Sequence, residues 1–178
     1  PDIPNMITVA ATDNNDQIAD FSAYGLNTID LAAPGVNTQS TVPGNQYAYM
    51  SGTSMATPHV AGVAALAFAL APQATYQQVV AAILGGVDLI PAVATDGPTP
   101  VSTGGRLNAY KTLLLMGPTV VASSPAANEV VTTPPVTYTL TFTQAIDPAS
   151  VDPTDFEVNG IPPDSASVSD DGLLVTFT

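Results

Sequence analysis

The sequence predicts an α/β domain over residues 1–117, followed by an all-β domain over residues 118–178. Before Gly117-Pro118, short apolar strands alternate with alanine-rich helical stretches, which is typical of an α/β domain. After it come alternating runs of Val, Thr, Pro and Asp with no basic residue. Several short strands separated by turn signals predict a β-sandwich for the second domain.

Three strands are expected in the first domain, at Met6 to Ala11, Thr28 to Ala33 and Tyr47 to Ser51. The first ends in a turn signature, the second is stopped by Pro34-Gly35, and the third follows Pro43-Gly44-Asn45. Proline, glycine and asparagine favour turns, so these residues limit the strands.

Three helices are expected in the same domain. The first begins around Ser54 and is apolar on every face from Val60 to Leu70, which predicts a buried helix too short to span a bilayer. The second runs from about Tyr76 to Leu84, with Thr75 and Gln78 spaced as a capping box, and the third covers Leu107 to Leu115. Residues 87–103 are expected to form a loop.

In the second domain, Val136 to Thr143 alternates between apolar and hydroxyl side chains, the period of a strand. Leu173 to Thr178 is a second candidate strand, and a third is expected to end at Phe156 to Gly160. The sequence stops inside a strand, so we expect the sandwich to be incomplete.

Charge and composition exclude several classes of function. The chain has 2 basic and 15 acidic residues and a net charge of -13, which disfavours nucleic acid and anionic lipid as partners. It has no cysteine, so disulfides, thiol catalysis and cysteine-based metal sites are absent. No signal peptide and no membrane-spanning stretch is visible in the sequence.

Ser54 is the candidate nucleophile because it lies between a glycine and the start of a long helix. A helix N-terminus carries partial positive charge and free N–H groups, so the N–H of Ser54 could stabilise an oxyanion. Gly52 would permit a tight turn and close approach of a substrate.

A serine hydroxyl also needs a base. His59 is the only histidine and lies five residues along the same helix, well round its circumference from Ser54. It is either that base or a partly buried structural histidine, and the helix geometry favours the second interpretation.

Two other serine motifs fail on this run. The Gly-x-Ser-x-Gly elbow needs glycine where Ala56 stands, and the Ser-x-x-Lys pattern needs lysine where Thr57 stands.

The run Gly52-Thr53-Ser54-Met55-Ala56-Thr57-Pro58-His59-Val60-Ala61-Gly62 resembles the serine motif of subtilisin-like serine proteases. Further segments resemble that family in its order: Ile7 to Thr12, Ala19 to Gly25, Asp30 to Val36, Ser40-Thr41 and Gly105 to Ala109. The resemblance implies a partial subtilisin-like three-layer fold with a parallel sheet, and a serine endopeptidase. It makes Ser54 the nucleophile, supported by Gly52, Thr53 and an oxidation-sensitive Met55.

The family's catalytic Asp and His motifs have no counterpart here, and the motif's own histidine, His59, is not the catalytic one. None of Asn5, Asn14, Asn15, Asn37 and Asn45 matches the oxyanion asparagine. We therefore expect those three residues upstream of Pro1 in a parent protein that cleaves proteins or peptides. We expect this fragment to be inactive, and residues 1–117 to fold poorly alone.

The second domain resembles bacterial immunoglobulin-like modules. The residues that carry this are Ser123 to Ala126, Tyr138 to Phe142, Asp147 to Val151, Asp155 to Gly160 and Val175 to Phe177. The resemblance implies an extracellular or cell-surface protein that could associate with surfaces through this module. The alternative function is a non-catalytic secreted adhesion or scaffold protein with a degenerate protease domain.

No cofactor or metal site is expected in these residues. Asp13 to Asp16 fails the EF-hand pattern because Ile18 stands where glycine is required. The acidic residues of the second domain could either bind calcium or lie in solvated turns, and turns are favoured. These residues are Asp147, Asp152, Asp155, Asp170 and Asp171. A structural calcium ion elsewhere in the parent protein stays open.

Overall fold

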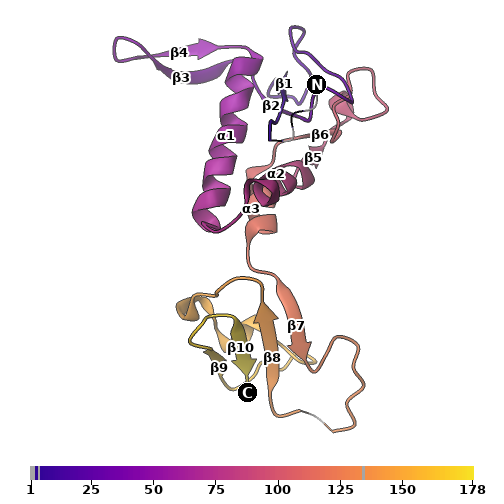
Figure 1. Cartoon of the computed structure of the whole chain (residues 1–178), viewed down its shortest axis with the longest axis vertical. Helices are drawn as coiled ribbons and strands as arrows, with labels where there is room; N and C mark the ends of the chain where they lie inside the picture. The colour runs from indigo at the N-terminus through magenta and orange to yellow at the C-terminus, as the bar shows by residue number, and fades with distance from the viewer. Residues whose placement is uncertain (1–2, 4, 134) are drawn as a thin grey trace. The chain divides into compact units, whose positions relative to one another are not determined.

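The computed structural model describes residues 3, 5–133 and 135–178, and the chain forms two compact units, Pro1–Met116 and Gly117–Thr178. The predicted boundary, between residues 117 and 118, lies beside this division. Figure 1 shows the elements of both units, and each unit is described by itself.

The first unit contains a four-stranded sheet in the order β1-β2-β6-β5. Its strands are β1 (Val9–Thr12), β2 (Leu31–Pro34), β5 (Asp88–Leu89) and β6 (Gly105–Arg106). β2 runs parallel to β1 and β6, whereas β5 runs antiparallel to β6. The sheet is therefore mixed and not parallel as predicted, because the chain returns from β5 to β6 without a crossover helix.

Three helices, α1 (Thr53–Leu70), α2 (Tyr76–Gly85) and α3 (Ala109–Met116), share one hydrophobic core with one face of this sheet. Val9 and Leu31 represent that face. The other face, with Ala10 and Ala32, packs against residues of the segment after β5: Ile90, Val93 and Val101. Among the described residues this second face meets only the short 3-10 helix η1 (Pro91–Val93) and loop segments. No α-helix covers it within them, so the predicted three-layer arrangement is not formed there.

Helix α1 is buried on one side, which contradicts the prediction of a helix buried all round. Its buried residues are Ala56, Val60, Val63 and Ala67. Leu66 and Leu70 expose 52% and 49% of their surface, and Phe68 exposes 40%. The described strands and helices reach only one side of α1, which leaves its other apolar side uncovered.

Helix α1 begins at Thr53, close to the predicted start around Ser54, and extends beyond the apolar run from Val60 to Leu70. By length and composition alone, its 18 residues could cross a membrane. However, Ala56, Val60 and Val63 pack into the core with β1 and β2, as expected of a core helix.

The capping box predicted at the start of α2 is confirmed. The Gln78 N–H donates to Thr75 Oγ1, and the Thr75 N–H donates to Gln78 Oε1. Two N–H groups of the first helical turn are thereby satisfied, which fixes where the helix begins.

A two-stranded hairpin precedes α1. It consists of β3 (Thr38–Val42), which the sequence analysis missed, and β4 (Gln46–Met50), close to a predicted strand. Its turn places Gly44 and Asn45 at φ 88° and 58°, conformations that these residue types tolerate. Figure 1 shows the hairpin extending from the start of α1.

The end of β1 contains a buried hydroxyl without a partner. Thr12 is fully buried, and within the described part of the chain its Oγ1 makes no hydrogen bond. An orphaned buried polar group costs about 1–3 kcal/mol. We expect Thr12→Val to raise the free energy of unfolding of the full chain by about 1 kcal/mol, measured in urea. A loss of stability would show that the hydroxyl has a partner.

Both basic residues of the chain bind carboxylates at the sheet edge. Lys111 Nζ lies 2.7 Å from Asp88 Oδ1, and Arg106 lies 3.3 Å from Asp88 Oδ2. Asn108 Nδ2 donates to Asp88 Oδ2 at 2.9 Å, and Arg106 Nε forms an ion pair with Asp16 at 2.7 Å. The pKa of Asp88 is held below its ordinary value, mainly by its interaction with Lys111 and to a smaller extent by Asn108 and Arg106.

This network predicts a loss of stability in acid. Because the folded-state pKa of Asp88 is depressed, its contribution is complete above the unfolded pKa of about 4 and disappears as pH falls through the folded pKa. Asp88→Asn should therefore have a lower Tm than the unmodified chain at pH 7. The difference in Tm between the two proteins should shrink below about pH 4. Melting curves over this range test it, and a difference that does not change with pH would contradict it.

The second unit is a single antiparallel sheet in the order β7-β8-β10-β9. Its strands are β7 (Val120–Ser124), β8 (Tyr138–Phe142), β9 (Ala166–Val168) and β10 (Leu174–Phe177). β8 and β10 lie within the predicted strands, and β7 and β9 were missed. Among the described residues there is no second sheet packed on the first, so the sandwich itself is not formed by them.

One predicted strand of this unit is wrong. Phe156 to Gly160 forms only an isolated bridge between Val158 and Ile161, around a tight turn. Phe156 instead packs between two rings of the sheet, with centroids 5.4 Å from Tyr138 and 4.9 Å from Phe177. Aromatic packing therefore takes the place of strand pairing here.

Candidate active site

The chain enters α1 through a turn fixed by backbone hydrogen bonds. The Gly52 N–H donates to the Gly35 carbonyl at 2.8 Å, and the Gly52 carbonyl accepts from Met55 N–H at 2.9 Å and Ala56 N–H at 3.3 Å. The Ser51 hydroxyl accepts from the Asn37 N–H at 2.9 Å. These contacts attach the start of α1 to the segment that follows β2.

Ser54 is exposed in the first turn of α1. Across the part of the chain that the structure describes, the N–H groups of Thr53 and Ser54 donate to no acceptor. Unpaired N–H groups at a helix N-terminus stabilise negative charge. The position therefore combines an exposed hydroxyl with a free donor for a developing oxyanion.

Gly52 does not form the tight turn that the sequence analysis predicted. Its backbone is extended, with φ 162° and ψ 160°, a conformation open to any residue. A Cβ there would lie 3.5 Å from Met55 Sδ, an ordinary contact. Within the described residues, neither backbone strain nor packing requires glycine at this position.

Thr53 and Met55 are half-buried on either side of Ser54. The Thr53 carbonyl accepts from the Thr57 hydroxyl at 3.0 Å, and the Met55 carbonyl lies 2.9 Å from His59 Nδ1. The carbonyls of both residues are thus engaged by side chains of the next turn of α1.

His59 is engaged with its own helix. Because a carbonyl oxygen can only accept, Nδ1 must carry the hydrogen in the contact with Met55. No hydrogen bond joins His59 to Ser54 among the described residues. This arrangement corresponds to the structural histidine that the helix geometry favours.

Gly35 is a positioning residue that the sequence analysis treated only as a strand stop. A Cβ at Gly35 would lie 2.6 Å from Ala11 Cβ, 2.8 Å from the Gly52 carbonyl and 3.2 Å from Ala56 Cβ. Glycine is therefore required where β1, β2 and the start of α1 meet. The sequence signal, a glycine directly after a strand, is also the signal of an ordinary turn.

Within the described residues, no group of three or more histidine, aspartate or glutamate side chains is placed to hold a metal ion. Asp13 Oδ1 accepts from the Gln17 and Asn15 N–H groups, which lower the pKa of Asp13. Asp152 and Asp171 accept similar local bonds. Turn formation thus accounts for these carboxylates.

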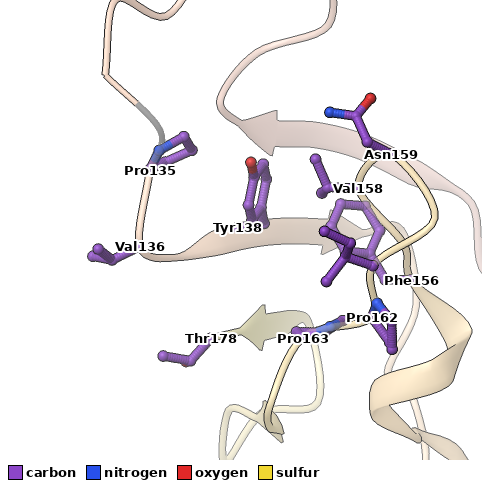
Figure 2. Close-up of a pocket in the computed structure, with 10 residues that line it drawn as sticks. Pro135, Val136, Tyr138, Phe156, Val158, Asn159, Pro162, Pro163 and Thr178 are labelled. Atoms are coloured by element: carbon purple, nitrogen blue, oxygen red, sulfur yellow. The ribbon is translucent and has the colours of Figure 1, made fainter.

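The second unit contains a shallow apolar pocket of about 290 Å³. Figure 2 shows Tyr138 and Phe156 beside Val158, with Pro162 and Pro163 nearby. The other lining residues are Pro135, Val136, Asn159, Ile161 and Thr178. The lining side chains include no carboxylate, histidine or cation, and the phenol of Tyr138 is their one titratable group.

A model described as the subtilase family matches residues 2–101, more than half of the chain. Alkaline elastase YaB from Bacillus sp. (strain YaB) is 64% identical over 62 residues, covering 35% of this chain and 16% of that protein. Subtilisin Savinase from Lederbergia lenta is 61% identical over 62 residues, 35% of this chain and 23% of that protein. The chain thus spans less than a quarter of these relatives.

Two solved structures are similar in fold. The prenylagaramide maturation protease PagA gives a TM-score of 0.56 at 29% identity, covering 64% of this chain and 43% of that one. The structure of the subtilase cytotoxin SubAB assembly gives a TM-score of 0.52 at 30% identity, covering 62% of this chain and 36% of that one. The similarity to these structures therefore includes the backbone as well as the sequence, over more than half of the chain.

Proposed function

Because the chain belongs to the subtilase family, whose model matches residues 2–101, we propose that Ser54 is the nucleophile of a serine endopeptidase. The observation that carries this proposal is an exposed Ser54 hydroxyl beside an unpaired N–H at the start of α1. The family relationship supports proteolysis, and Ser54 is the serine of the matching motif.

The proposed reaction is acyl transfer through Ser54. The hydroxyl oxygen attacks the peptide carbonyl while a base removes its proton, and the Ser54 N–H donates to the oxyanion. The amine then leaves with a proton, and water hydrolyses the acyl-enzyme. Gly52 leaves room for the substrate backbone, and Thr53 and Met55 hold the first turn in place.

The base and its orienting acid lie outside these residues in this proposal. His59 is the chain's single histidine, and it donates to its own helix. The chain spans 16% of one close relative and 23% of another, which is consistent with a site completed by further parts of the protein. The exposed apolar side of α1 is a surface on which such parts could pack.

The substrates in this proposal are proteins or peptides, and nucleic acid is not a partner because of the net charge of -13. Tyr47 and Tyr49 of β4 expose 71% and 68% of their surface a few residues before Ser54. In this proposal, β4 lies near the leaving-group side of the bound substrate. We extend the proposal to an extracellular protein whose second unit is an immunoglobulin-like module. If the protein holds a structural calcium ion elsewhere, addition of a chelator should lower its Tm.

A fluorophosphonate probe on the full-length protein tests the role of Ser54. Such probes react with a serine hydroxyl only when a base activates it. We expect labelling that disappears in Ser54→Ala and persists in the matched control Ser40→Ala, an exposed serine of β3. Labelling that survives Ser54→Ala would place the nucleophile elsewhere. A folded protein without labelling would favour the non-catalytic scaffold.

A further inference from the structure

A tight turn at Asn159-Gly160 closes the isolated bridge between Val158 and Ile161. Asn159 and Gly160 both have positive φ, 55° and 77°. The turn is held by two backbone hydrogen bonds, Val158 N–H to Ile161 at 3.0 Å and Ile161 N–H to Val158 at 3.1 Å. Within the part of the chain that the structure describes, these two bonds form an isolated bridge outside any named strand. We therefore expect the turn to open at low free-energy cost.

Both reacting groups of this turn are free. Asn159 and Gly160 are exposed, and among the described residues neither the Asn159 amide nor the Gly160 N–H makes a hydrogen bond. Gly160 has no Cβ, and the space where one would stand is open to 4 Å. Figure 2 shows Asn159 at the edge of the pocket. Nothing in the described structure shields the amide carbon from the following backbone nitrogen.

We propose that Asn159 is a site of spontaneous deamidation in the folded protein. After a base removes its proton, the Gly160 nitrogen attacks Asn159 Cγ, and the Cγ–Nδ2 bond breaks as ammonia leaves. The product is a cyclic imide that joins the two residues. Water then adds to one imide carbonyl and breaks one ring C–N bond, which gives aspartate or isoaspartate at position 159.

The structure distinguishes Asn159 from the other asparagines with positive φ, which are Asn37, Asn45 and Asn128. All are exposed, but Asn159 is the only one followed by glycine. Asn128 is the closest comparison, because it lies in a similar turn at φ 65°. Its neighbour Glu129 has a Cβ, and the Glu129 N–H donates to Ala126 at 3.0 Å. The nucleophile is therefore occupied at Asn128 and free at Asn159.

The modification would change the pocket wall. Aspartate adds a negative charge beside an apolar lining in a unit that has no basic residue. Isoaspartate also adds a methylene group to the main chain between Val158 and Ile161. The two hydrogen bonds of the turn then no longer align, and the wall that Val158 and Ile161 provide is displaced.

Peptide mapping of the full chain after incubation at mildly alkaline and mildly acidic pH tests the proposal. We expect the peptide containing Asn159 to gain the mass that separates an amide NH2 from a carboxyl OH. The gain should be faster in alkali and should give two separable products. An isoaspartate-specific methyltransferase should label one of them. Asn128 provides an internal control that should change far more slowly, and Asn159→Gln should abolish the change at this position.

Two outcomes would overturn the proposal. If the urea-unfolded chain is modified at Asn159 while the folded chain is not, the turn protects the amide. If Asn128 reacts as fast as Asn159 in the folded chain, the free Gly160 nitrogen has no influence. The behaviour of Asn159→Asp, which keeps the turn and supplies the aspartate product, gives the expected chromatographic position of that product.

Discussion

Under the proposed function, the 178-residue chain by itself is expected to hydrolyse peptides about a million-fold more slowly than a protein in which a histidine base completes the site. In subtilisin, the system from which this magnitude comes, removal of the histidine costs about that factor in kcat. The physical reason here is that the Ser54 hydroxyl stays protonated at neutral pH, because His59 is bound to Met55 and no other histidine exists.

Peptidase assays on the purified chain and on the full-length protein measure this difference directly. The chain alone should also fail to react with a fluorophosphonate. Reaction of the chain alone would contradict the prediction and place a base within it. His59→Ala then decides whether that base is His59, because loss of labelling in this variant would identify it.

Replacing Gly35 by alanine is expected to lower the free energy of unfolding by about 3 kcal/mol or more. The new methyl group would lie 2.6 Å from Ala11 Cβ and 2.8 Å from the Gly52 carbonyl. Neither neighbour is the end of a flexible side chain, so β1 or the start of α1 has to move. The hydrogen bond from Gly52 N–H to Gly35 would be strained by the same movement.

Gly62→Ala is the matched control for this substitution. Gly62 lies exposed within α1, and a Cβ there would meet nothing within 4 Å. Alanine in a helix interior is more stable than glycine by about 0.5–1 kcal/mol. Urea denaturation should therefore give opposite signs for the two variants. Equal effects would show that Gly35 is not under steric constraint.

Local sequence signals predicted the elements that depend on neighbouring residues. The Thr75 and Gln78 capping box forms as predicted, and the turn at Pro43-Gly44-Asn45 closes a hairpin. The alternation from Val136 to Thr143 contains β8. The position of Ser54 was predictable from local sequence in the same way, because a glycine before a long helix places the next residues at the helix N-terminus.

Features that depend on distant contacts were not predicted. Gly35 looks like a strand stop, and its contact with Ala11 and Gly52 exists only after β1 and β2 pair. The prediction that α1 is buried all round was wrong. An apolar composition does not show how many sides of a helix pack against other elements. β3 was missed because it is polar and exposed, so it carries no apolar alternation.

The two basic residues that bind Asp88 also allow the folded state of the chain to be detected by proteolysis. Trypsin cuts after lysine and arginine, so it has two sites in all 178 residues, after Arg106 and after Lys111. In the folded chain Arg106 lies in β6 before the buried Leu107, and Lys111 lies within α3. Limited digestion should therefore leave the folded chain whole and cut the unfolded chain in that short interval, which separates the second unit from most of the first.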